Sequence, residues 1–186
     1  MAYTKVSVPR RNTTNSPGAP TPKNATVIVI DVDTIDSFPE RDANGVLLDG
    51  AITLLAGEKA VGVYATPGSI SRNDASEGDA DAEAFTQNGS FKHPGNSLAI
   101  DEFAQNWVGK NCVIITRGEH VSDTRVHGSP TNPVRITYEG QDNNEANVAT
   151  FTFVSSMRGK KAAHYHGAMP ALATDATYDG SSGGGI

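Results

Sequence analysis

The alternation of apolar and polar residues predicts a body built mainly of β-strands. Short runs rich in β-branched and aromatic residues recur between turn sequences such as Asn44-Gly45 and Pro67-Gly68. Roughly eight segments have this character, a number typical of a β-sandwich or a small barrel. The predicted strands are 25–32, 46–55, 60–66, 84–93, 112–117, 134–138, 148–154 and 162–166.

The segment 25–32 has the strongest strand character in the chain. Its residues Val27-Ile28-Val29-Ile30 follow one another without a polar interruption. A strand with one face in solvent alternates, so a continuous apolar run predicts burial on both faces or a central place in the sheet. The β-branched run that begins at Cys112 predicts a second buried strand.

One segment departs from the strand pattern and predicts an α-helix over about 97–109. Its apolar positions have helical spacing and form one stripe: Ile100, Phe103, Ala104 and Trp107. Ser97 can cap the first turn, and Gly109 supplies a stop. Without a second helix to cover the other face of a parallel sheet, a doubly wound fold is disfavoured. We therefore expect a β-sandwich or barrel with one flanking helix.

The two ends of the chain differ in composition from the predicted β-rich domain, residues 25–166. Residues 1–24 are rich in Pro, Asn, Ser and Thr, which predicts an extended arm that is either disordered or docked on a neighbour. Residues 167–186 are small and end in a Gly-rich run, which predicts a flexible tail.

The formal net charge of −6 is unevenly distributed. Residues 1–30 contain no acid and carry four bases, whereas residues 31–102 contain 14 acids and 4 bases. The four bases of the arm are Lys5, Arg10, Arg11 and Lys23. A basic arm joined to an acidic body points to a partner of complementary charge. No apolar run approaches about 18 residues, so we expect no membrane span.

The sequence around Asp31 and Asp33 resembles the first motif of haloacid-dehalogenase-type phosphatases. There, one carboxylate is the nucleophile and the next is a general acid beside a magnesium ion. Ile35 departs from the residue usual in that family, and the helices required between parallel strands are missing. The alternative is a strand end whose carboxylates face water or cap a turn, and we favour it.

A second acidic cluster consists of Glu77, Asp79, Asp81 and Glu83. It lacks the glycine and the terminal glutamate of an EF-hand loop, so its spacing does not match that calcium motif. Alternation would place Asp79, Asp81 and Glu83 on one face of a strand. We favour a solvated or channel-facing acidic surface.

His164 and His166 are a possible transition-metal pair, but no third ligand is near them in sequence. Cys112 is the single cysteine, and its apolar neighbours favour an inert core thiol. Nucleophile-elbow, Walker and Gly-x-Gly-x-x-Gly sequences are absent. We therefore expect no enzyme activity, no catalytic residue, no cofactor and no bound metal.

The order of elements resembles the major tail tube proteins of tailed bacteriophages. A basic arm leads into a β-rich body, and the helix at 97–108 is followed directly by the strand at 112–117. The chain then runs through 128–135 into a hairpin at 138–153. The resemblance covers about residues 25–166 and implies a sandwich or barrel with one helix, shared with the tubes of related injection machines.

The resemblance also implies a structural role in the virion tail, with the protein made in the cytoplasm of a host bacterium. Subunits of that family self-assemble into rings, usually hexameric, which stack into a conduit for DNA ejection. The expected partners are further copies of the chain, other virion proteins, and DNA that passes without specific binding.

Two sets of residues would serve this role. The basic arm with Lys5, Arg10, Arg11 and Lys23 would lie on the acidic body of the next subunit. The acids from Glu77 to Glu83 would face the lumen or an adjoining ring and repel DNA phosphates. The alternatives are a capsid decoration protein, a head–tail joining protein, a ligand-binding β-sandwich or a metal-dependent hydrolase.

Overall fold

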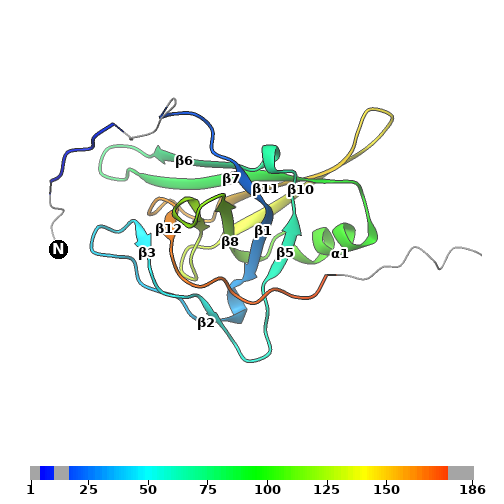
Figure 1. Ribbon diagram of the computed structural model, residues 1–186, viewed down its shortest axis with the longest axis horizontal. Helices are drawn as coiled ribbons and strands as arrows, with labels where there is room; N and C mark the ends of the chain where they lie inside the picture. Colours follow the sequence, from blue (N-terminus) through cyan, green and yellow to red (C-terminus); the bar gives the residue numbers. More distant parts are fainter. Residues whose placement is uncertain (1–4, 11–16, 176–186) are drawn as a thin grey trace, which may run out of the picture.

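The computed structural model describes residues 5–10 and 17–175, which form a mainly β protein with one α-helix (Figure 1). This confirms the predicted fold class. The elements are β1 (Lys23–Asp31), β2 (Ile35–Ser37), β3 (Leu47–Leu48), β4 (Thr53–Leu54), β5 (Val61–Tyr64), β6 (Ser71–Glu77), β7 (Ala84–Pro94), α1 (Leu98–Trp107), β8 (Asn111–Gly118), β9 (Arg125–His127), β10 (Val134–Asp142), β11 (Asn147–Ser155) and β12 (Ala163–Tyr165). Three short 3-10 turns, η1 (Val32–Thr34), η2 (Pro67–Ser69) and η3 (Val121–Asp123), connect some of them.

Ten of the strands form one sheet, which branches at β8. The sheet runs in the order β3-β12-β9-β8-β10-β11-β7-β6, and β1 joins β8 on its other edge, with β5 beyond β1. The register pairs Val29 with Ile114 and Ile28 with Ile115. Strands β10, β11, β7 and β6 fold over the β5-β1-β8 part, so that two layers face each other across a shared core.

Strands β1 and β8 are buried on both faces, as the continuous apolar run predicts. Val27 and Val29 point into a core cluster between the two layers, which also contains Ile114. Ile28 and Ile30 point the opposite way into a second cluster, which is covered by the segments around β3 and β12. Each side chain of the run therefore contributes to a core.

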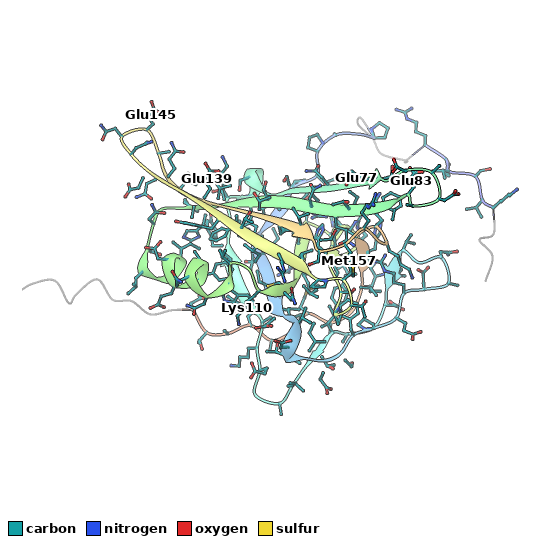
Figure 2. All side chains as sticks on the ribbon, turned by 180° about the vertical axis from the view of Figure 1, so that it is seen from behind. Glu77, Glu83, Lys110, Glu139, Glu145 and Met157 are labelled. Carbon is teal, nitrogen blue, oxygen red and sulfur yellow. The ribbon has the colours of Figure 1, made fainter. Side chains whose placement is uncertain are left out.

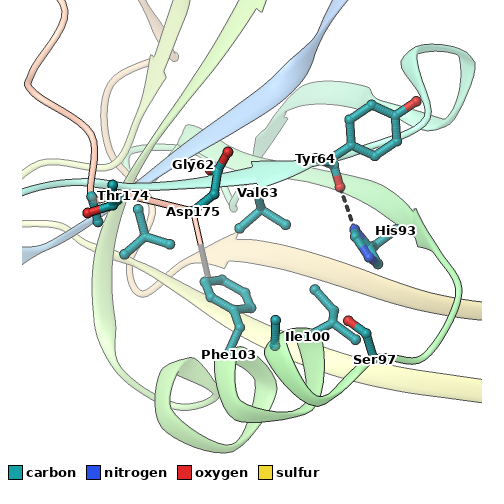
Figure 3. Close-up of a pocket in the computed structure, with 12 residues that line it drawn as sticks. Gly62, Val63, Tyr64, His93, Ser97, Ile100, Phe103, Thr174 and Asp175 are labelled. Atoms are coloured by element: carbon teal, nitrogen blue, oxygen red, sulfur yellow. Dashed lines mark hydrogen bonds between the residues drawn. The ribbon is translucent and has the colours of Figure 1, made fainter. Parts of the chain in front are cut away.

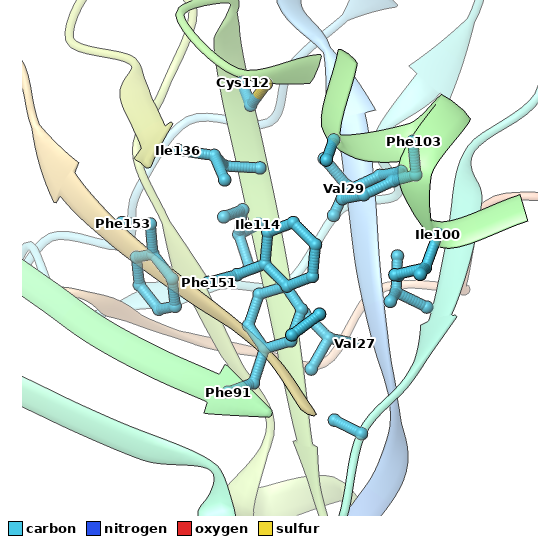
Figure 4. Close-up of a cluster of buried hydrophobic side chains, with 14 of the residues drawn as sticks. Val27, Val29, Phe91, Ile100, Phe103, Cys112, Ile114, Ile136, Phe151 and Phe153 are labelled. Atoms are coloured by element: carbon cyan, nitrogen blue, oxygen red, sulfur yellow. The ribbon is translucent and has the colours of Figure 1, made fainter. Parts of the chain in front are cut away.

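The larger core is closed by aromatic side chains and by α1 (Figure 4). The rings of Phe91 and Phe151 stack with centroids 5.1 Å apart, and Phe103 of the helix meets Phe151 edge-on at 5.3 Å. Ile100 is buried on the same helix face, and Trp107 is partly buried against the cluster. The predicted helix and its apolar stripe are confirmed.

Several segments differ from the sequence prediction. Residues 71–77 form the edge strand β6, paired along its whole length with β7, although their polar composition suggests a loop. The ladder to β7 satisfies one side of the β6 backbone, and both faces of an edge strand can remain polar. The segment 46–55 contains two short strands, β3 and β4, instead of one long strand.

The described part of the predicted C-terminal tail lies against the body. Leu172 forms a parallel bridge with Ala60, whose N–H donates to Ala171 O at 3.0 Å and whose C=O accepts from Ala173 N–H at 2.8 Å. Residues 171–173 therefore extend the β-structure beside β5. Part of the segment predicted as a flexible tail is therefore paired within the described residues.

The N-terminal segment and α1 lie toward opposite ends of the longest axis (Figure 1). Residues 5–10 extend away from the body at the end where β6 and β7 meet. The tip of the β10–β11 hairpin and α1 lie at the other end.

Candidate assembly surface

The basic residues of the predicted arm do not form one unit. Lys5 and Arg10 are exposed on the extended segment, and Arg11 lies outside the described residues. Lys23 is the first residue of β1, and its Nζ donates to Thr21 O at 2.6 Å and to Thr21 Oγ1 at 2.9 Å. Burial and the neighbouring Arg72 lower the pKa of Lys23. Lys23 therefore belongs to the body of the protein.

The predicted acidic cluster lies at the β6–β7 hairpin, with all four carboxylates exposed. Glu77 ends β6, and its Oε2 accepts from Thr86 Oγ1 at 2.9 Å. Asp79, Asp81 and Glu83 follow in the turn, where Asp81 has a φ of 72°. These three acids therefore do not alternate along one strand face. Figure 2 shows Glu77 and Glu83 at one end of the molecule.

The outer half of the β10–β11 hairpin is a feature that the sequence reasoning missed. The ladder runs from Val134↔Ser155 to Asp142↔Asn147, but β8 pairs only with Val134 and Arg135. Residues 137–142 have no strand on their outer edge within the described residues, and all of them are exposed. This end of the hairpin projects from the body, with Glu145 at its tip and Glu139 nearer the body (Figure 2).

Besides the outer half of β10, one edge of β5 is also incompletely paired. Ala65 N–H donates to Ala25 O, so the alternation of an antiparallel ladder turns the backbone groups of Gly62 and Tyr64 away from β1. His93 Nδ1 lies 2.9 Å from Tyr64 O. Within the described residues, the N–H and C=O of Gly62 have no backbone partner on this side.

A groove of about 320 Å³ lies between the β5 edge and α1 (Figure 3). Its apolar lining comes from Val61 and Val63 of β5 and from Ile100 and Phe103 of α1. Asp175 lies at one end, and the residues that line the groove include no lysine or arginine. The arrangement is an apolar channel beside a strand edge with free hydrogen-bonding groups.

A polar cluster lies where β6, β8, β9 and η3 meet. Arg72 of β6 donates from Nη1 to Asp123 O at 2.6 Å, while its Nε and Nη2 are buried without a hydrogen-bond partner in the described residues. Burial and the nearby Arg125 lower the pKa of Arg72 to about 10. These groups orient β6 against η3.

His127 is fully buried in the same cluster and lies 3.2 Å from Thr116 Oγ1 through its Nε2. Burial, with the charges of Arg72 and Arg125, lowers the pKa of His127 to about 3. The imidazole is therefore neutral at neutral pH. A buried neutral histidine tied to a threonine is typical of a structural position.

The candidate catalytic and metal residues have other contacts in the fold. Asp31 Oδ1 accepts from Asp33 N–H at 3.1 Å and caps η1, while Oδ2 pairs with Lys110 Nζ at 2.7 Å. This matches the alternative of carboxylates that cap a turn. His164 Nδ1 lies 2.6 Å from Arg125 Nη1, and His166 is exposed.

Cys112 is buried, and burial raises the pKa of its thiol to about 12. Within residues 5–10 and 17–175, no three His, Cys, Asp or Glu side chains gather as a metal site. In the same part of the chain, no helix has the length and apolar character needed to cross a membrane.

No protein-family model, curated protein or solved structure matches this chain. The geometry of the sheet edges and of the chain ends is therefore the basis for a functional proposal.

Proposed function

We propose that this chain is a virion structural protein, the subunit of a bacteriophage tail tube that self-assembles into stacked hexameric rings. The observation that carries the proposal is the pair of incompletely paired sheet edges, at Gly62 of β5 and along the outer half of β10. Both lie beside α1, because Ile100 and Phe103 line the groove next to β5, and Val108 after the helix bridges to Ile136 of β10.

Open edges of this kind favour association between copies. A strand edge presents a row of N–H and C=O groups that can pair with another chain, and a closed ring removes such edges. The outer half of β10 is also exposed on its side chains, although the ring of Tyr138 packs on Phe151. In a ring, β10 of one subunit would meet a strand of its neighbour.

The charge distribution supports a conduit for DNA. The exposed acids Glu77, Asp79, Asp81 and Glu83 share one hairpin, and a wall of such groups repels phosphate. DNA would then pass without specific binding, because a wall that repels phosphate does not replace its counterions. Other virion proteins would contact the two ends of the tube.

Negative-stain microscopy and sedimentation velocity of the purified full chain test the proposal. We expect stacked rings or hollow filaments whose abundance rises with protein concentration. A capsid decoration or head–tail joining protein would give isolated rings or small oligomers without stacking. A ligand-binding β-sandwich would remain monomeric, so a single monomeric species at high concentration would reject self-assembly altogether.

A further inference from the structure

We propose that residues 5–10 of a second copy bind as an added strand on the edge of β5, with Val6 and Val8 in the groove between β5 and α1. The inference rests on the proposed function insofar as both require self-association. It goes further by naming the segment, the receiving strand and the groove.

The N-terminal segment has the character of a strand without a sheet. Val6 is 65% exposed and Val8 is 91% exposed, and Ser7 lies between them. In an extended conformation, Val6 and Val8 share one face and Ser7 occupies the other. Two valines on one face of a solvent-exposed segment are an apolar strip that gains free energy when it is covered.

The groove offers the complementary features. Residues 171–173 pair with Ala60 on this edge, and beyond them the N–H and C=O of Gly62 have no backbone partner in the described residues. An incoming segment can hydrogen-bond to this part of the edge. The side chains of Ile100 and Phe103 lie beside that edge and line the groove (Figure 3). A strand added to β5 would direct alternate side chains toward this apolar lining.

Charge also favours this occupant. The segment carries Lys5 and Arg10 at its two ends. The groove has Asp175 at one end and no lysine or arginine in its lining, and Asp101 lies on the adjoining helix. The resulting attraction is weak for each exposed pair, but no lysine or arginine in the groove lining repels Lys5 or Arg10.

The positions of segment and groove explain why the donor is a second copy. Residues 5–10 lie at one end of the longest axis, whereas α1 and the adjoining groove lie toward the other (Figure 1). A contact between different surfaces of two copies is heterologous, and repetition of it closes a ring or continues as a filament. Both outcomes suit a tube.

The other occupant to consider is the chain's own end, because Thr174 and Asp175 line the groove. The residues that follow, 176–186, read Ala-Thr-Tyr-Asp-Gly-Ser-Ser-Gly-Gly-Gly-Ile. They offer no pair of β-branched residues at alternate positions, whereas Val6 and Val8 form one. We therefore assign the groove to the N-terminal segment.

The first test compares three full-length proteins by sedimentation velocity over a concentration series. The double variant Val6→Asp/Val8→Asp should raise the dissociation constant by about 100-fold, since each buried valine contributes about tenfold. Ser7→Asp is the matched control and should assemble like the parent chain, because its side chain faces away from the groove. Equal weakening by both variants, or undiminished assembly of the double variant, would overturn the proposal.

The second test locates the contact by oxidative cross-linking of mixed variants that each carry one added cysteine, with the native Cys112 buried in the core. Val8→Cys is mixed with Ser97→Cys or with Thr174→Cys, which lie in the two end regions of the groove (Figure 3). In at least one mixture, a disulfide should join the two different variants. The direction of the added strand relative to β5 decides whether the partner is Ser97→Cys or Thr174→Cys. The control partner Val121→Cys, which is 65% exposed on η3 outside the groove, should give none.

The two tests separate the inference from the proposed function. A parent chain that stays monomeric defeats the tube proposal and this inference together. Assembly of the parent chain without a groove cross-link defeats only the inference. If deletion of residues 176–186 is needed before Val8→Cys cross-links, the chain's own end fills the groove, and the assignment to the N-terminal segment is wrong.

Discussion

The β1–β8 pair and the outer half of the β10–β11 hairpin are built from the same antiparallel ladder but have opposite surroundings. In the first, Ile28 and Ile115 face one core cluster while Val29 and Ile114 face the other. In the second, residues 137–142 are exposed throughout, and this half of β10 has no outer strand within the described residues. One antiparallel ladder is common to both regions, whereas the burial and the pairing of the outer edges differ.

The difference in burial indicates which region stabilises the folded monomer and which can bind another molecule. A ladder hydrogen bond contributes only about 1 kcal/mol net, because it replaces hydrogen bonds to water. Full burial of an isoleucine or valine side chain contributes roughly 1.5–3 kcal/mol in addition. The β1–β8 pair therefore holds the fold together, while the hairpin end is free to meet another molecule at little cost to the monomer.

The largest effect is expected at the doubly buried pair. Ile28 is 1% exposed, and Ile28→Ala should lower the free energy of unfolding by about 3–4 kcal/mol through lost burial and an internal cavity. Gln141→Ala, at an exposed position in the outer half of β10, should cost less than about 1 kcal/mol. Urea denaturation measures both values. Similar losses would contradict the division between the two regions.

A second, smaller effect concerns pH and belongs to the buried region. His127 stays neutral in the folded protein down to a pKa of about 3, whereas its unfolded value is 6.5. The unfolded state therefore binds more protons between these values, and stability falls as pH drops through 6.5. The loss from this group should reach about 2 kcal/mol at pH 5, measured by urea denaturation at pH 7 and pH 5.

The control variants isolate that contribution. His127→Gln keeps a polar group beside Thr116 but cannot titrate, so the stability difference between pH 7 and pH 5 should shrink by about 2 kcal/mol. His120→Gln, at an exposed position, should leave the difference as in the parent chain. An unchanged pH dependence in His127→Gln would show that another group is responsible.

The buried elements could be predicted from the sequence, whereas the exposed strands could not. The doubly buried run at Val27–Ile30 and the helix stripe at Ile100 and Phe103 carry strong periodic signals, because burial dictates residue type there. Strand β6 and the outer half of β10 carry no such signal. Their side chains meet water on exposed faces, so hydrogen bonding to a neighbouring strand, which composition does not encode, decides their conformation.

The candidate assembly surface was only partly predictable for the same reason. Lys5 and Arg10 could be assigned to an arm from charge alone, and the acids at 77–83 could be recognised as an exposed cluster. The groove depends on β5 and α1, which are distant in sequence, and on residues 171–175 returning to the strand edge. Val6-Ser7-Val8 gave the only local signal for it, an apolar alternation within a polar arm.

Substitutions in the acidic β6–β7 turn should have the smallest effect on stability but should slow DNA release. Changing Asp79, Asp81 and Glu83 to Lys alters exposed groups in a hairpin turn, so the free energy of unfolding should change by less than about 0.5 kcal/mol. If these carboxylates face the lumen, the variant tube should retain double-stranded DNA at low salt and slow its release. Release should recover as salt rises, because the new phosphate contacts displace counterions.

The opposite end of the molecule provides a control for this experiment with the same change in charge. Glu139, Asp142 and Glu145 changed to Lys also replace three exposed acids, on the β10–β11 hairpin (Figure 2). DNA release through tubes of this variant should match that of the parent chain, with any defect confined to subunit assembly. Retention of DNA by the hairpin variant and free release by the turn variant would place the lumen beside β10 and not beside the β6–β7 turn.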